Sequence, residues 1–113
     1  MRLLNDSALH KTLERWLAGK LIVDIMSTLE AAGIEGELLK RLTTELALGV
    51  ANKWEGTPSA QRELNGEKVA PFLVFGIQND NEDVIVRNFD EMGSFLTKET
   101  TIALHHIFDH APR

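Results

Sequence analysis

The fold is decided by the apolar stretch at residues 69–77, VAPFLVFGI, which a polar turn separates from VIVR at residues 84–87. Apolar residues stand at both odd and even positions of the first stretch, as is typical of a strand covered on both faces. The turn at residues 79–83, NDNED, is short enough to join two antiparallel strands. The sequence therefore predicts a central antiparallel β-hairpin over residues 69–88. We expect four side chains of its first strand to be buried: Phe72, Leu73, Val74 and Phe75.

A long helical pattern lies near the start of the chain. Leucine or isoleucine recurs every four residues from Leu9 to Leu29, which indicates one apolar helix face. Asp6 or Ser7 can cap the beginning of this helix by accepting a backbone N–H bond. Gly33 stands where a left-handed residue would end it. Further apolar residues lie beside the main stripe, so we expect this helix to be central or shared with a second subunit.

A second helix is predicted over residues 37–54, because leucine and valine repeat there on one side. The two helices should form an antiparallel helical hairpin over residues 7–55. Gly19 and Gly49 lie inside these helices, at a cost of about 1 kcal/mol each relative to alanine. We expect a close approach of the two helix backbones to compensate.

A polar connector at residues 56–68 separates the helical half from the β-hairpin. Asn65-Gly66 within it is a good turn signal, and a short strand around residues 61–64 could precede that turn. The number of strands, two or three, therefore stays open.

The chain is predicted to end in a C-terminal helix over residues 97–110, whose apolar residues gather on one face. The order of helices and strands defines an α+β fold. With 113 residues the chain fits a single domain, residues 1–113. This arrangement is too generic to indicate a function by itself.

The composition restricts the classes of function. The formal net charge is −5 and the basic residues are scattered, so nucleic acid is not an expected partner. The absence of cysteine excludes disulfides, thiolate metal sites and cysteine nucleophiles. No segment has the length of a membrane span and no signal peptide stands at the start, so we expect a soluble protein in the cytoplasm.

The sharpest chemical pattern is a histidine cluster near the end of the chain. His106 and His110 are four residues apart and share one side of the predicted helix, a spacing that can hold Zn²⁺ or another transition metal. A third ligand would have to come from elsewhere. The candidates are His10, Asp24, Glu45 and Asp90. The alternative interpretation is that these imidazoles stabilise the negative end of the helix.

No catalytic triad, phosphate-binding loop or cofactor motif accompanies the histidines, so the sequence favours a non-enzymatic protein without a cofactor. We expect a small acidic protein–protein interaction module, regulatory, adaptor or inhibitor-like, that forms a homodimer. A metal-binding protein or metal-dependent enzyme using His106 and His110 is the alternative. Six apolar residues are the expected interface: Trp16, Leu21, Ile22, Met26, Phe72 and Val74.

Overall fold

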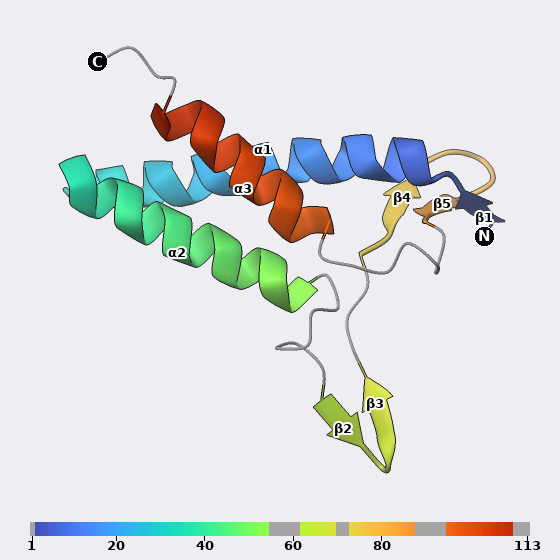
Figure 1. The fold of residues 1–113 in the computed structure, drawn as a ribbon. Coiled ribbons are helices and arrows are strands. Elements are labelled where there is room, and N and C mark those ends of the chain that lie inside the picture. Colours follow the sequence, from blue (N-terminus) through green and yellow to red (C-terminus); the bar gives the residue numbers. More distant parts are fainter. Residues whose placement is uncertain (1, 55–61, 70–72, 88–94, 110–113) are drawn as a thin grey trace.

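The computed structural model describes residues 2–54, 62–69, 73–87 and 95–109. The elements in chain order are β1 (Arg2–Asn5), α1 (Ser7–Ala31), α2 (Gly36–Trp54), β2 (Arg62–Leu64), β3 (Glu67–Val69), β4 (Phe75–Ile77), β5 (Asp83–Val86) and α3 (Phe95–Asp109). Figure 1 shows α1 and α2 as an antiparallel hairpin with α3 packed against it, and the strands β1, β4 and β5 beside the beginning of α1. The predicted α+β fold is confirmed.

The boundaries of α1 follow from its end residues. Asp6 is the N-cap, and its side chain accepts a hydrogen bond from the backbone N–H of Leu9 at 3.0 Å. After the helix, Gly33 has a φ of +87°, which glycine adopts without the steric cost of a side chain. Both signals were predicted from the sequence. None of the helices in the described parts of the chain is long and apolar enough to cross a membrane.

The three helices pack through small residues. Ala18 on α1 and Ala51 on α2 are fully buried with Leu96 of α3, and Ile22 is buried with Ala47 and Leu104. Alanine at these positions lets the helix backbones approach closely. The core of the described residues therefore lies between the helices, and not between the helices and the sheet.

The expected role of the two helix glycines is wrong. A Cβ atom built on Gly19 or on Gly49 would meet no atom within 4 Å. The helices approach each other at the buried alanines instead, and Gly19 faces open space.

The main sheet has the strand order β1-β5-β4 and is mixed. β4 and β5 form the predicted antiparallel hairpin, with Phe75 opposite Ile85. β1, which the sequence did not predict, pairs parallel to β5. Arg2 of β1 holds Asp83 of β5 through Nε–Oδ1 and Nη2–Oδ2 contacts of 2.8 and 2.9 Å, and this bidentate pair fixes the register.

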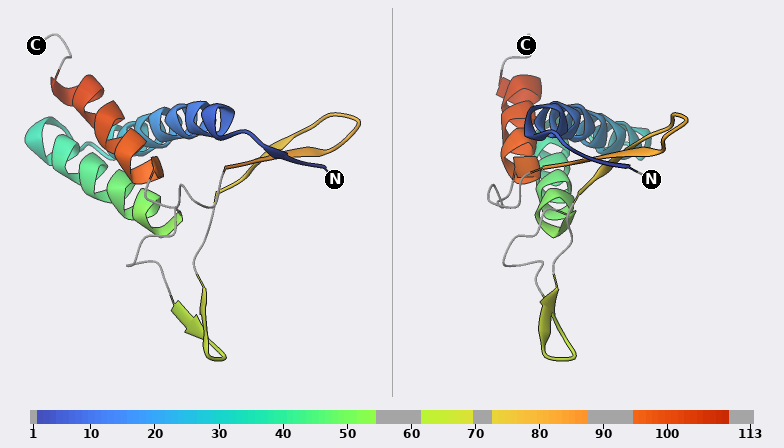
Figure 2. Two further views of the ribbon diagram at one scale, coloured as in Figure 1. Left: turned by 45° about the vertical axis from the view of Figure 1, so that its right-hand side comes forward. Right: turned by 90° about the vertical axis from the view of Figure 1, so that its right-hand side faces the viewer.

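A separate two-stranded hairpin is formed by β2 and β3, joined at Asn65 and Gly66. Both turn residues have positive φ, 52° and 83°, as an Asn-Gly hairpin turn requires. The short strand expected around residues 61–64 therefore forms. Figure 2 shows this hairpin standing away from the helices.

The apolar stretch 69–77 is not one strand, and this part of the prediction is wrong. Val69 ends β3, whereas β4 begins only at Phe75. Val74 is 51% exposed, and Leu73 and Phe75 are only partly buried. The expected cover is missing because the helices pack on one another, with α1 against β5 as their main contact to the sheet. Phe72 lies outside the described residues.

Candidate functional site

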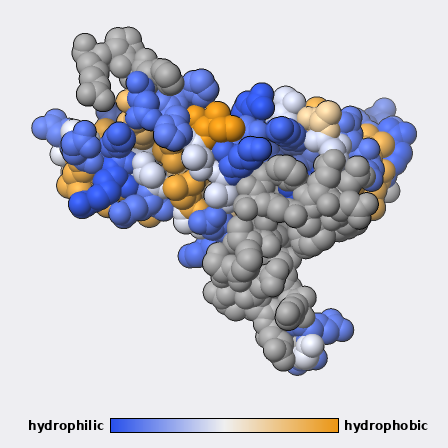
Figure 3. Space-filling model, in the orientation of Figure 1, coloured by the Kyte–Doolittle hydropathy of each residue, from blue (hydrophilic) through white to orange (hydrophobic). Residues whose placement is uncertain are grey.

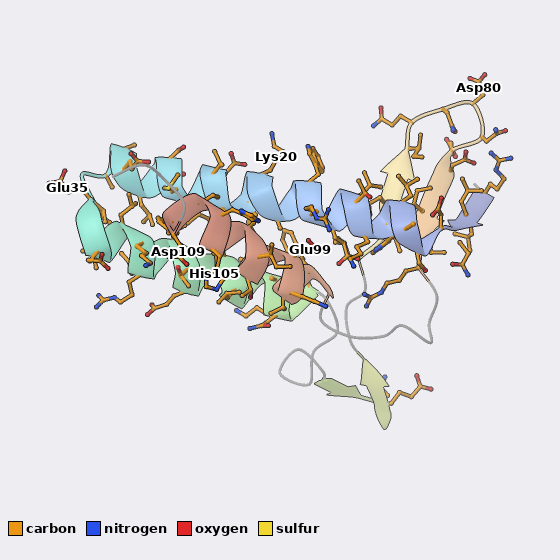
Figure 4. The ribbon with its side chains drawn as sticks, turned by 45° about the horizontal axis from the view of Figure 1, so that its top comes forward. Lys20, Glu35, Asp80, Glu99, His105 and Asp109 are labelled. Atoms are coloured by element: carbon orange, nitrogen blue, oxygen red, sulfur yellow. The ribbon has the colours of Figure 1, made fainter. Side chains whose placement is uncertain are left out.

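The predicted metal pair is only half described. His106 is exposed on the last turns of α3, and His110 lies outside the described residues. The next helix face carries His105, whose Nδ1 contacts Asp109 Oδ2, and Lys40 Nζ lies 3.5 Å from Asp109 Oδ1 (Figure 4). The hydrogen bond from His105 and the nearby Lys40 lower the pKa of Asp109.

A metal site at this place would need a further ligand. No group of three histidine, aspartate or glutamate side chains in residues 2–54, 62–69, 73–87 and 95–109 is arranged to hold a metal ion. Of the additional ligands considered from the sequence, His10 is buried against other groups and Asp90 lies outside the described residues. The metal hypothesis stays a prediction without a specific structural observation in its favour.

The six expected interface residues fall into different environments. Trp16 is 59% and Val74 is 51% exposed, so both can meet a partner. Leu21 and Met26 are partly buried. Ile22 has no exposed surface and belongs to the core between the helices, so it offers nothing to a partner of the folded chain. Phe72 is outside the described residues.

One exposed apolar stripe runs along α1. Leu9, Trp16 and Val23 follow one another at seven-residue spacing and are 36%, 59% and 47% exposed. Residues seven apart on a helix lie nearly on the same face. We call these three residues the outer stripe. The buried residues of α1 lie on the opposite face of the helix. They are His10, Glu14, Ala18 and Ile22.

The outer stripe faces solvent in the isolated chain. Lys20, which lies beside it, has its Nζ 6.0 Å from the centre of the Trp16 ring, within reach of a weak cation–π contact. Figure 4 shows Lys20 pointing away from α2 and α3. Apolar surface also lies over the helices on the face drawn in Figure 3, interleaved with polar side chains. α1 is therefore apolar on two opposite faces, of which the protein itself covers one.

A groove of about 520 Å³ lies between α1 and α3, next to the outer stripe. We call it the α1–α3 groove. At one place it contains a charged pair, in which Arg15 Nε donates to Glu99 Oε2 at 3.0 Å. Its lining residues are Arg15, Gly19, Glu99, Ile102, Ala103, His106 and Ile107. The groove thus combines apolar walls with a polar rim, the mixture found at protein interfaces.

A buried polar cluster joins α1 to the sheet. His10 and Glu14 have no exposed surface, and Arg87 directly after β5 is 8% exposed. His10 Nε2 lies 2.7 Å from the carbonyl oxygen of Leu73, and its ring meets Phe75 edge-on at 5.1 Å. Arg87 Nη1 lies 4.0 Å from Glu14 Oε1.

The geometry of this cluster requires a shared proton. A carbonyl oxygen only accepts hydrogen bonds, so His10 Nε2 carries a hydrogen and donates it to Leu73. In a neutral imidazole, Nδ1 is then an acceptor, and it lies directly against Glu14 Oε1. The two atoms are in contact without the alignment of a hydrogen bond. Two acceptors in a buried contact repel, so a proton on either His10 or Glu14 stabilises the pair.

Burial acts on Glu14 in the same direction. It raises the pKa of this carboxyl from 4.5 to about 7, because the charged form loses its hydration. Arg87 and Lys11 oppose the rise, and Glu99 adds to it. A carboxyl that titrates near neutrality can take part in proton transfer. Here His10 and Glu14 are both fully buried, so they act on the fold and not on a substrate.

The sequence contained a signal for this cluster that was read one residue out of phase. The four-residue repeat of leucines starting at Leu9 placed the buried face one position away from His10 and Glu14. A histidine and a glutamate at i and i+4, next to an apolar stripe, could have indicated a buried pair. Arg87 was not predictable in this role, because its position depends on the packing of β5 against α1.

No known protein family, curated protein or solved structure matches this chain.

Proposed function

We propose that the protein is a non-enzymatic interaction module that acts through protein–protein contacts as a homodimer. The observation that carries this proposal is the outer stripe of α1, which exposes Trp16 and Val23 on the helix face opposite the core. Exposed tryptophan is the side chain most often found at the energetic centre of protein interfaces.

The accessible surface of the chain supports the proposal. The chain exposes 7746 Å². A compact protein of 12.6 kDa is expected to expose about 6,200 Å². The difference of about 1,500 Å² exceeds the roughly 800 Å² that each partner buries in a standard interface. The radius of gyration, 16.1 Å, is likewise larger than the value of about 13 Å expected for this length. Association of two chains would bury this surplus.

A regulatory, adaptor or inhibitor-like role in the cytoplasm fits this class of protein. A cysteine-free, acidic chain needs no oxidising compartment to fold, and its net charge of −5 favours basic partner surfaces beyond the dimer itself.

Sedimentation equilibrium at micromolar concentration tests the proposal. We expect a dimer for the unmodified chain and dissociation in Trp16→Ala. Trp54→Ala is the matched control, because Trp54 is also a helical tryptophan and is 44% exposed, but belongs to α2. A monomer for the unmodified chain would contradict the homodimer. Equal dissociation of both variants would contradict the role of the outer stripe.

A further inference from the structure

We infer that two copies of the chain pair antiparallel through α1, with the twofold axis beside Trp16. This inference rests on the proposed function and specifies its interface. A twofold contact joins the same patch of both subunits, so the patch must be complementary to itself after rotation. The outer stripe has this property, because Leu9 and Val23 each lie seven residues from Trp16. An antiparallel partner therefore places Leu9 against the partner's Val23, and Trp16 near the partner's Trp16.

Charge favours this orientation over the parallel one. A parallel pair would set Lys20 beside the partner's Lys20 and align the two helix dipoles in the same direction. In the antiparallel pair, Lys20 lies opposite the partner's Thr12, because both residues are four positions from Trp16. The helix dipoles then oppose each other, which is the favourable arrangement.

Gly19 provides the space that such a pair needs. In the antiparallel alignment, Gly19 lies opposite the partner's Leu13, since each is three residues from Trp16. A Cβ atom at Gly19 would meet nothing within 4 Å, so the chain itself leaves this position open. The position also borders the α1–α3 groove, whose wall includes the 40%-exposed Ile102. A large apolar side chain from a second copy can enter here.

The absence of cysteine allows a direct test by thiol crosslinking. Thr12→Cys and Lys20→Cys leave the outer stripe intact. In the double variant each new thiol faces the other thiol of the partner, within reach of a short bismaleimide. The two positions are eight residues apart on one helix, about 12 Å at 1.5 Å per residue, which is too far for the same reagent to bridge within a chain. We expect covalent dimers from the double variant and none from either single variant.

Each other outcome decides the question. A covalent dimer from Thr12→Cys alone or Lys20→Cys alone would show parallel helices and overturn the inference. A dimer by sedimentation that no variant crosslinks would place the interface elsewhere, overturning the inference while leaving the proposed homodimer in place. A chain that is monomeric by sedimentation would overturn both.

Discussion

Replacing Glu14 by glutamine should make the stability of the protein less dependent on pH. Glutamine resembles the protonated carboxyl, and its amide N–H can donate to His10 Nδ1 where the carboxylate only repels it. The folded protein holds the Glu14 proton with a pKa of about 7, against 4.5 as the ordinary value. Below pH 4.5 the carboxyl is protonated in both the folded and the unfolded chain and makes no difference.

The sign of the pH effect follows from this raised pKa. As the pH rises from 4.5 to 7, the unfolded chain ionises first, so the free energy of unfolding falls with increasing pH. A shift of two to three pKa units corresponds to about 3 kcal/mol. Glu14→Gln should therefore match the unmodified chain near pH 4.5 and exceed its stability by about 3 kcal/mol at pH 8, which is on the order of 10 °C in Tm for a domain of this size.

Urea denaturation between pH 4.5 and pH 8 measures the effect, and the difference between the two proteins removes the contribution of the other titrating groups. Glu30→Gln is the matched control, because Glu30 lies on the same helix and is exposed. We expect the control to follow the unmodified chain at every pH. A Glu14→Gln variant that is less stable at pH 8, or a difference that does not change with pH, would refute the reasoning.

Three further predictions concern the interface, the core and the sheet. Trp16→Ala removes one anchor from each subunit, about 2 kcal/mol each, so the dimer Kd measured by sedimentation should rise about 1,000-fold; a change below tenfold would contradict its position on the twofold axis. Ile22→Ala should lower the free energy of unfolding in urea by about 2–5 kcal/mol, because Ile22 is fully buried; a loss below about 1 kcal/mol would contradict that burial. Asp83→Asn weakens the pair with Arg2, so the amide of Leu4 should exchange faster with deuterium; unchanged exchange would show that β1 is held by its backbone bonds alone.

The same aspartate explains a second pH effect, of opposite direction. Hydrogen bonds from Arg2 and Asn79 lower the pKa of Asp83. A lowered pKa means that this contribution to stability is present at neutral pH and is lost as the pH falls through the lowered value. Strand β1 should therefore loosen in acid, while the Glu14 region loosens toward neutral and alkaline pH.

The helices and turns could be predicted because their signals are local. Asp6 and Gly33 bound the first helix, and Asn65-Gly66 defines the turn between β2 and β3, in the sequence and in the structure alike. Each signal involves a few neighbouring residues, so no knowledge of the tertiary fold is needed.

What could not be predicted depends on distant parts of the chain. β1 is four residues long and pairs with a strand near residue 85, so no local pattern reveals its partner. The burial of His10 depends on Leu73 and Phe75, which follow it by more than sixty residues. For the same reason the exposure of Val74 was missed: its sequence neighbours are apolar, but the helices that should cover it pack on each other.

The parallel pairing of β1 with β5 sets an order of events during synthesis. Arg2 and Asp83 are 81 positions apart, so β1 leaves the ribosome long before its partner strand exists. α1 follows immediately, and its buried pair of His10 and Glu14 has no Arg87 and no Leu73 to meet until most of the chain has been made. Contacts of such long sequence separation form late in folding. The nascent chain therefore carries an amphipathic helix with both faces uncovered, a state in which chaperones can recognise it and two neighbouring chains on one messenger can pair before either has finished folding.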